Sequence, residues 1–327
     1  MKKQFAKMFV GAAVVAVALT ACGEGSPSGS TSGAAEASDG LTKVVVGVLP
    51  IAPSAAVQYG IDKGIFEEHG LQVELSNASS GAAMLPAVST GDINVGIGNP
   101  LSVLVSKDKG LDMKILSGYS NSKAEGDDIT GVVVKADSGI DSWADLAGKT
   151  VSVNSVNTQG DLTIMEAASQ DGGDPKAVKF SELSFPDAPA QLERGNVDAS
   201  WLPEPFLAQT LADPAYKLLG YNYQDTIPGL PTMVAFTSGK YASENPEVVA
   251  DFNAALTEVL DAAESDSAGV ASSVAGFLKI DEAKAQKISM EEFSGELRTD
   301  QLTKLGELML KYGYVSKQPD LQGIIAN

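Results

Sequence analysis

The sequence predicts an α/β fold in which strands and helices alternate. Short runs of β-branched and other apolar residues are followed by longer segments of helical pattern, and glycine, proline or a capping residue separates them. The chain has 327 residues, of which 44% are apolar, so it can bury a proper core and suggests about two domains. We therefore expect two lobes, each with a parallel sheet and helices on both of its faces.

The first half opens with a continuous β-branched run at 43–49, the pattern of a strand buried on both faces. Two prolines end this strand, and a helix is expected over 54–69, with Gly70 as its stop. The pattern then predicts, in order, a strand at 71–75, a helix from 79–81 to about 91, a strand at 93–97, a helix from 99–100 to 107, and strands at 113–119 and 130–135.

The second half repeats this alternation. Ser142 begins a short helix with a capping pattern. The elements expected after it are a strand at 150–154, a helix at 159–170, a strand at 179–183, a helix at 188–194, a strand at 197–202, a helix begun by Pro203-Glu204-Pro205, and a strand at 233–237. From Asn245 onward the pattern is almost entirely helical.

The N-terminal segment has the features of an export signal. Residues 1–21 combine three lysines with an apolar run of about a dozen residues, too short to span a bilayer of about 30 Å. The Leu-Thr-Ala-Cys that ends at Cys22 matches the bacterial lipobox, in which the cysteine thiol takes a lipid and cleavage falls just before it. We expect a signal peptide at 1–21 and a lipidated Cys22 followed by a flexible Gly/Ser/Ala linker over 22–40. The mature protein would then be exported and lipid-anchored to the outer face of the cell membrane.

Composition excludes several functions. The net charge is −19 and no basic cluster occurs after residue 7, which argues against nucleic-acid binding. Cys22 and His69 are the only residues of their types, so the chain cannot form an internal disulfide or a zinc site built from Cys and His. We expect no metal, no cofactor and no catalytic residue, and nothing in the sequence suggests an oligomer rather than a monomer.

Small polar segments lie where several predicted strands end and helices begin. Helix N-termini offer unpaired backbone N–H groups, and where two α/β lobes meet these ends face a shared crevice. Each segment alone is equally well explained as an ordinary helix cap, and Trp201 beside the last one suits packing as well as ligand contact. The residues predicted to contact a ligand are Ser54, Ser79, Ser80, Gly81, Asn99, Asn157, Thr158, Gln159 and Glu204.

Four motifs carry a resemblance to a known family. They are GIDKGIFEEHGLQV at 60–73, MLPAVSTGDINVG at 84–96, IDSWADLAGKTVSV at 140–153 and AQLERGNVDASWLPEPF at 190–206. With them, about residues 43–315 resemble the substrate-binding proteins of ABC importers for nitrate, sulfonates, taurine and thiamine-precursor pyrimidines. The chain departs from the family pattern at Asn94, where aspartate is usual, and at Ala147, where lysine is common.

The resemblance implies a type II periplasmic-binding-protein fold. Each lobe would be a mostly parallel sheet flanked by helices, with lobe 1 formed by 41–133 plus 234–327 and lobe 2 by 134–233. Two hinge crossovers would lie near 131–136 and 231–236. The protein would capture a small organic solute by hinge closure and deliver it to a membrane permease.

Two other functions share this fold. The chain would act as a receptor if it handed its ligand to a membrane sensor, and the sequence does not separate that role from transport. A pyrimidine-synthase-like enzyme is the least favoured alternative. By resemblance such an enzyme depends on a cysteine-rich motif and an active-site histidine, and this chain has neither.

The charge of the ligand is left open between two classes. Sulfonate and nitrate binders of the family often place a Lys or Arg in the cleft, whereas Arg194 and Arg298 fall on predicted helices away from the junctions. Asp161, Asp187 and Glu204 lie near the junctions, and an isolated buried carboxylate costs several kcal/mol unless it is paired. These acids slightly favour a neutral or amine-bearing solute, such as a pyrimidine. Helix N-termini, however, also bind anions without any countercharge.

Overall fold

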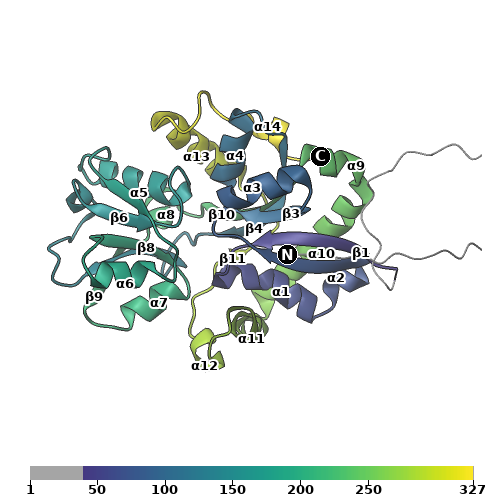
Figure 1. The fold of residues 1–327 in the computed structure, drawn as a ribbon, viewed down its shortest axis with the longest axis horizontal. Coiled ribbons are helices and arrows are strands. Elements are labelled where there is room, and N and C mark those ends of the chain that lie inside the picture. The colour runs from purple at the N-terminus through teal and green to yellow at the C-terminus, as the bar shows by residue number, and fades with distance from the viewer. Residues whose placement is uncertain (1–39, 327) are drawn as a thin grey trace, which may run out of the picture. The chain divides into compact units, whose positions relative to one another are not determined.

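The structure, a computed structural model, describes residues 40–326 (Figure 1). The predicted signal peptide, Cys22 and the linker up to residue 39 lie outside the described residues. The described part contains two sheets, each flanked by helices, as the sequence predicts (Figure 1). Both sheets are mixed, because each contains antiparallel pairs that the strand–helix alternation does not reveal. Within residues 40–326, no helix combines the length and apolar character needed to cross a membrane.

The first sheet has the strand order β11-β4-β10-β3-β1-β2. Its strands are β1 (Thr42–Val48), β2 (Leu71–Asn77), β3 (Val95–Gly98), β4 (Met113–Asn121), β10 (Pro231–Ser238) and β11 (Glu292–Phe293). β1 pairs in parallel with β2 and β3, whereas β10 runs antiparallel to both β3 and β4. β10 is buried along its whole length because it lies in the middle of the sheet.

The second sheet has the order β7-β6-β8-β5-β9 and comes from one continuous stretch of chain. Its strands are β5 (Thr130–Lys135), β6 (Thr150–Val153), β7 (Lys179–Glu182), β8 (Ala199–Pro203) and β9 (Tyr216–Gly220). β6 pairs in parallel with β7 and β8, and β5 runs antiparallel to β8 and β9. Each sheet therefore contains one reversed interior strand, namely the strand that follows a crossover from the other sheet.

The crossovers lie a few residues earlier than the sequence suggests. β5 belongs wholly to the second sheet and β10 wholly to the first. The connections between the sheets are therefore 122–129 and 227–230 rather than 131–136 and 231–236. The β-branched pattern at 130–135 identifies a strand correctly, but it does not tell which sheet the strand joins.

Helices cover both faces of the first sheet. In Figure 1, α1 and α10 lie on one side of it and α3 and α4 on the other. The helices of this lobe are η1 (Ala52–Ser54), α1 (Ala55–Asp62), α2 (Ile65–Glu68), α3 (Gly81–Thr90), α4 (Pro100–Asp108), α9 (Gly239–Glu244), α10 (Pro246–Ser265), α11 (Ser267–Leu278), α12 (Glu282–Ala285), α13 (Thr299–Lys311) and α14 (Leu321–Ile324). Phe66 of α2 stacks on Phe252 of α10 at a centroid distance of 5.8 Å, and both are buried in the core.

Two local differences from the expected elements have clear causes. The single helix expected over 54–69 is broken at Gly64, whose φ of 74° is a left-handed conformation that glycine adopts without steric cost. In the second lobe, η2 (Trp143–Leu146), α5 (Gln159–Gln170), α6 (Ala188–Glu193) and α7 (Phe206–Leu211) lie close to their expected places. β9 and α8 (Asn222–Thr226) were not expected, because the sequence between 212 and 230 lacks a clear period.

The last residue of α13 and the segment that follows it contact α5 of the other lobe. Lys311 Nζ pairs with the Glu166 carboxylate at 2.6 Å, and the Tyr312 hydroxyl donates to the same carboxylate at 2.8 Å. The Tyr314 hydroxyl donates to Asp161 Oδ2 at 2.8 Å. We call these residues, 311–314 with Glu166 and Asp161, the C-terminal clasp. It ties the two lobes together at a place distant in sequence from both crossovers.

Candidate ligand-binding site

A cavity of about 50 Å³ lies between the two lobes and is lined by residues of both. Its volume exceeds the ~10–15 Å³ that one water molecule requires, so it suits a small solute. The lining residues lie at or near the ends of the sheet strands, as expected for an α/β crevice. From the first lobe they are Leu49, Ile51, Gly98, Asn99, Thr232, Met233 and Glu291; from the second, Thr130, Asn154, Thr158, Gln159, Gly160, Phe185, Trp201, Pro203 and Tyr223.

Three aromatic side chains form one wall. The ring centroids of Phe185 and Trp201 are 5.6 Å apart, and those of Trp201 and Tyr223 are 5.8 Å apart, with interplanar angles of 64° and 56°. The indole is seated against Gly160 at the start of α5, where an added Cβ would lie 3.0 Å from the ring. A Cβ at position 160 would be a tight contact, so the indole or the helix would have to shift slightly to admit it. The wall thus depends on one glycine as well as on the three rings.

Two side-chain amides join the lobes beside the cavity. Asn154 Nδ2 donates to the Ser79 carbonyl at 2.9 Å, and Gln159 Nε2 donates to the Pro231 carbonyl at 2.8 Å. Asn99 lies opposite them and caps α4, since its Oδ1 accepts from the Ser102 N–H at 2.9 Å. These bonds hold the lobes close together around the cavity.

Three buried polar atoms of the lining have no hydrogen-bond partner within residues 40–326. They are Gln159 Oε1, Thr130 Oγ1 and Trp201 Nε1. A buried polar group left unpaired costs about 1–3 kcal/mol. The cavity therefore has an unpaired acceptor, an unpaired hydroxyl and an unpaired N–H donor among the described residues. A polar solute that bonded to them would remove the free-energy cost of leaving them unpaired.

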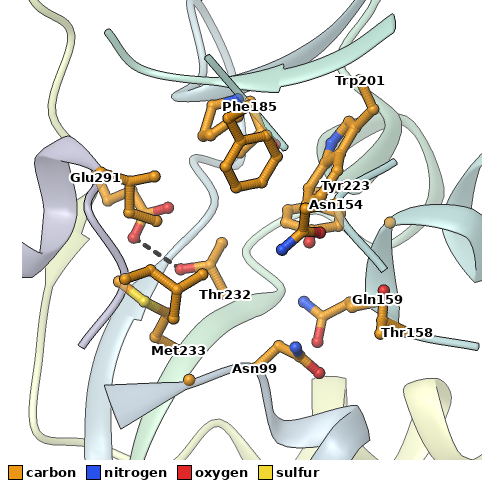
Figure 2. A pocket seen from close by; sticks show the side chains of 16 residues that line it. Asn99, Asn154, Thr158, Gln159, Phe185, Trp201, Tyr223, Thr232, Met233 and Glu291 are labelled. Carbon is orange, nitrogen blue, oxygen red and sulfur yellow. Dashed lines mark hydrogen bonds between the residues drawn. The ribbon is translucent and has the colours of Figure 1, made fainter. Parts of the chain in front are cut away.

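Within the described part of the chain, Glu291 is the only acidic side chain that lines the cavity. It is fully buried, and its Oε2 accepts from Thr232 Oγ1 at 2.7 Å (Figure 2). Thr232 in turn lies 2.8 Å from Ser120 Oγ. Burial, reinforced by the negative charge of nearby Asp128, raises the pKa of Glu291 to about 8. The described residues contribute no Lys, Arg or His to the lining.

Three of the residues predicted from sequence line the cavity: Asn99, Thr158 and Gln159. Ser80 instead caps α3 by accepting from the Ala83 N–H at 3.0 Å, and Gly81 is the first residue of that helix. Ser79 contributes only its carbonyl, to Asn154. For these junctions the helix-cap explanation is the better one.

Ser54 and Asn157 also lie outside the lining. Ser54 is buried in η1, and its hydroxyl has no partner within the described residues. Asn157 is exposed in a left-handed conformation, with φ of 57°, and its N–H donates to Asp161 at 2.7 Å. It forms part of the turn that begins α5.

Glu204 is buried as a site acid would be, but it does not line the cavity. Its carboxyl accepts from the Ala208 N–H at 3.2 Å, in the first turn of α7. Burial raises the pKa of Glu204 to about 7. Its backbone carbonyl accepts from the Ala52 N–H of the other lobe at 3.1 Å. The acidic side chain that lines the cavity within the described residues is that of Glu291.

Sequence reasoning missed Phe185, Tyr223 and Glu291. Phe185 follows the end of β7, and Tyr223 lies in a helix that the pattern did not reveal. Glu291 lies beside β11, in a stretch that the pattern assigns to helix. In the sequence, Trp201 suits ligand contact as well as packing. In the structure its buried indole N–H has no partner among the described residues, which favours ligand contact.

Comparison with known proteins gives a family-level match. A family model described as "NMT1/THI5 like" matches residues 53–266. The taurine-binding periplasmic protein of Escherichia coli K12 is 29% identical over 195 residues, which cover 58% of this chain and 57% of that protein. The formylaminopyrimidine-binding protein of Halalkalibacterium halodurans is 23% identical over 221 residues, or 64% of this chain and 62% of that protein. The chain thus spans less than two thirds of either relative.

Solved structures share the fold at low sequence identity. The alkanesulfonate-binding protein SsuA from Xanthomonas axonopodis pv. citri, bound to MOPS, superposes with a TM-score of 0.74 at 16% identity, covering 87% of this chain and 98% of that one. The periplasmic nitrate-binding protein NrtA from Synechocystis PCC 6803 gives 0.70 at 12% identity, covering 87% and 85%. Both likenesses concern the two-lobe fold.

Proposed function

The chain belongs to the NMT1/THI5-like family, and on this premise we propose that it is the solute-binding protein of an ABC importer. The observation that carries the proposal is the cavity between the lobes, with three buried polar atoms that lack partners within the described residues. Such a cavity suits reversible capture of a small solute. The relatives named as taurine- and formylaminopyrimidine-binding proteins support the same kind of role.

Capture would proceed by hinge closure about the connections 122–129 and 227–230. A solute that contacts both lobes stabilises the arrangement in which they lie together, and so shifts the population toward it. The bonds from Asn154 and Gln159 across the cavity, together with the C-terminal clasp, would form and break in each cycle. Binding by this route requires no covalent step.

We further propose that the mature protein begins at a lipidated Cys22 on the outer face of the cell membrane. The lipobox that ends at this residue supports the anchor. From there, as a monomer, it would present the closed form to a membrane permease. The word "periplasmic" in the names of relatives agrees with an extracytoplasmic site of action.

The test uses the chain from residue 22 with Cys22→Ser, which prevents lipidation. A thermal-shift panel would compare sulfonates, nitrate and bicarbonate with pyrimidines, nucleobases and amines. A ligand present at 1,000 times its Kd adds about 4 kcal/mol to stability, so a true solute raises the Tm by several degrees.

The matched variants are Thr130→Val and Ser102→Ala. Each removes a buried hydroxyl without a partner in the described part of the chain, but only Thr130 lines the cavity. We expect Thr130→Val to weaken binding of the solute about tenfold, the effect of about 1.4 kcal/mol, without loss of stability. Ser102→Ala should bind as the parent does. A solute whose affinity is unchanged by both Thr130→Val and Trp201→Ala would bind elsewhere, and the proposal would fail.

A further inference from the structure

We propose that the cavity takes a small organic cation, whose charged group lies among Phe185, Trp201 and Tyr223 with Glu291 as its counter-charge. The inference rests on the proposed function, since it names the class of solute for the same cavity. The sequence leaves open whether the solute is an anion or a neutral or amine-bearing molecule, and the inference favours the amine-bearing class. Three features of the cavity carry it: the charge of the lining, the aromatic wall and the unpartnered polar atoms.

The lining offers no positive charge that would stabilise an anion. Among residues 40–326, the lining contains Glu291 and no Lys, Arg or His, and Asp128 lies close enough to Glu291 to raise its pKa. An anion in this cavity would meet an acidic group without a basic partner. A cation would instead supply a charge of the sign that the lining lacks.

The helix N-termini at the cavity are partly capped by the chain's own acceptors. Asn99 Oδ1 accepts from the first turn of α4 at 2.9 Å. Asp161 accepts from the N–H groups of Asn157 and Thr158 at 2.7 and 2.8 Å, and so places a carboxyl at the start of α5. The negative charge of the Asp161 carboxyl lowers the attraction of the start of α5 for an anion. This weakens the physical argument for a sulfonate or nitrate ligand that needs no basic residue.

The aromatic wall supplies what a cation binds. Ring faces attract a cation within about 6 Å of the centroid, most strongly for tryptophan, and groups of rings recognise alkylammonium ligands. Trp201, the central ring, has both other rings within 5.8 Å of its own centroid. Figure 2 shows Glu291 and Thr232 on the opposite side of the cavity from Trp201. A cation between them would contact ring faces on one side and the carboxyl on the other.

The unpartnered atoms predict a polar tail on the cation. Polar groups of a ligand would accept from Trp201 Nε1–H or donate to Gln159 Oε1, and Thr130 Oγ1 can do either. These three side chains are each at least nine-tenths buried. The ligand class is therefore a compact cation that carries at least one hydroxyl or similar group.

Glu291 gives the proposal a pH signature. With its pKa raised to about 8, the carboxyl of the empty protein holds its proton at neutral pH. The groups that face the Glu291 carboxyl are Ser120, Thr232, Asp128 and the hydroxyls of Tyr119 and Tyr223. Glu291 also lines an adjoining cavity, whose charged residues include Lys123, Glu264 and Glu292. A bound cation favours the carboxylate, so binding releases this proton to solvent.

The probes are three molecules of one shape that differ in charge: choline, its neutral isostere 3,3-dimethylbutan-1-ol, and the anion 2-hydroxyethanesulfonate. Isothermal titration calorimetry would be run from pH 6 to pH 9 on the chain from residue 22 with Cys22→Ser. We expect choline to bind at least about tenfold more tightly than the alcohol, and the sulfonate not to bind. Choline cannot lose a proton, so a change of its affinity with pH reports on the protein. Its association constant should rise about tenfold per pH unit below pH 8 and then level off, with one proton released.

The matched variants are Glu291→Gln and Glu296→Gln, which make the same change of net charge at a lining residue and at an exposed one. Glu291→Gln should lose at least about tenfold in choline affinity and lose the pH dependence. Its affinity for the alcohol should be unchanged, which also shows that the cavity is intact. Glu296→Gln should behave as the parent.

Tighter binding of the sulfonate than of choline, a choline affinity that is flat or falls with pH, or no binding of any probe would each overturn the inference. Sulfonate binding that Thr130→Val weakens would leave the proposed function standing while this inference fails. A solute whose affinity is unaffected by changes in the cavity would instead contradict the proposed function itself.

Discussion

Replacing Glu204 with glutamine should make the folded protein more stable at alkaline pH. The side chain is 4% exposed, and burial raises its pKa from 4.5 to about 7. Glutamine keeps the shape and the carbonyl that accepts from Ala208, but it carries no charge to bury. The difference between pKa values of 4.5 and about 7, at 1.36 kcal/mol per pKa unit, corresponds to about 3 kcal/mol.

The sign follows from which state holds the proton. Below pH 4.5 the Glu204 carboxyl is protonated in both the folded and the unfolded chain, so it imposes no cost. Between pH 4.5 and about 7 the unfolded chain loses the proton first, and stability falls as the pH rises. Above about pH 7 the full cost of the buried carboxylate remains. Parent and Glu204→Gln should therefore be nearly equal at pH 4.5 and differ by about 3 kcal/mol at pH 8.

Urea unfolding at pH 4.5, 6, 7 and 8 measures this difference directly. Glu291 also lowers the stability of the parent as the pH rises, but it does so equally in the variant and cancels in the comparison. Glu193→Gln, at an exposed position in the same lobe, is the matched control and should follow the parent. If the curves of parent and Glu204→Gln run parallel from pH 4.5 to pH 8, burial does not control this carboxyl and the reasoning is wrong.

Three further changes test the clasp, the aromatic wall and the core. Tyr314→Phe removes the hydroxyl that donates to Asp161, a bond of about 1–3 kcal/mol, and should speed solute release about tenfold in stopped-flow measurements; an unchanged rate would mean that the clasp does not open during release. Gly160→Ala places a Cβ 3.0 Å from the Trp201 ring and should weaken solute binding at least fivefold by calorimetry, at a cost in stability of about 1–3 kcal/mol; parental affinity would show that the ring position does not matter. Phe252→Ala should lower the free energy of unfolding by about 3–5 kcal/mol in urea, and a loss under about 1 kcal/mol would contradict its place in the core.

Sequence pattern predicted best the elements whose ends are set by local chemistry. The helix expected at 159–170 matches α5 residue for residue. Thr158 and Asp161 form a capping box at its start, and glycines follow its end, so neighbouring residues determine where the helix begins and ends. The strand at 130–135 likewise matches β5, because a β-branched run has few alternatives.

The site was harder to predict because its parts meet only through tertiary structure. Asn99 follows β3 directly, and Thr158 and Gln159 lie at the start of α5 after the short loop that follows β6, so topology places them at the cavity. Glu291 reaches the cavity from the segment just before β11, a strand of two residues that has no period to detect. Glu204, in contrast, stands at a junction that looks like a binding site, yet its side chain turns to α7. Position along the chain indicates the edge of the sheet, but not the direction in which a side chain points.

The place of β10 in the first sheet also fixes the order in which the lobes can fold. β3 and β4 are not neighbours in that sheet; β10 lies between them, although the whole second sheet precedes it in the chain. Residues 130–220 contain every strand of the second sheet, so that sheet can pair as soon as its own segment is available. The first sheet stays divided, with two open strand edges, until β10 arrives. A chain cut short before residue 231 would therefore expose the edges of β3 and β4 to pairing with other chains, and completion of the first lobe would be the slow, late step of folding.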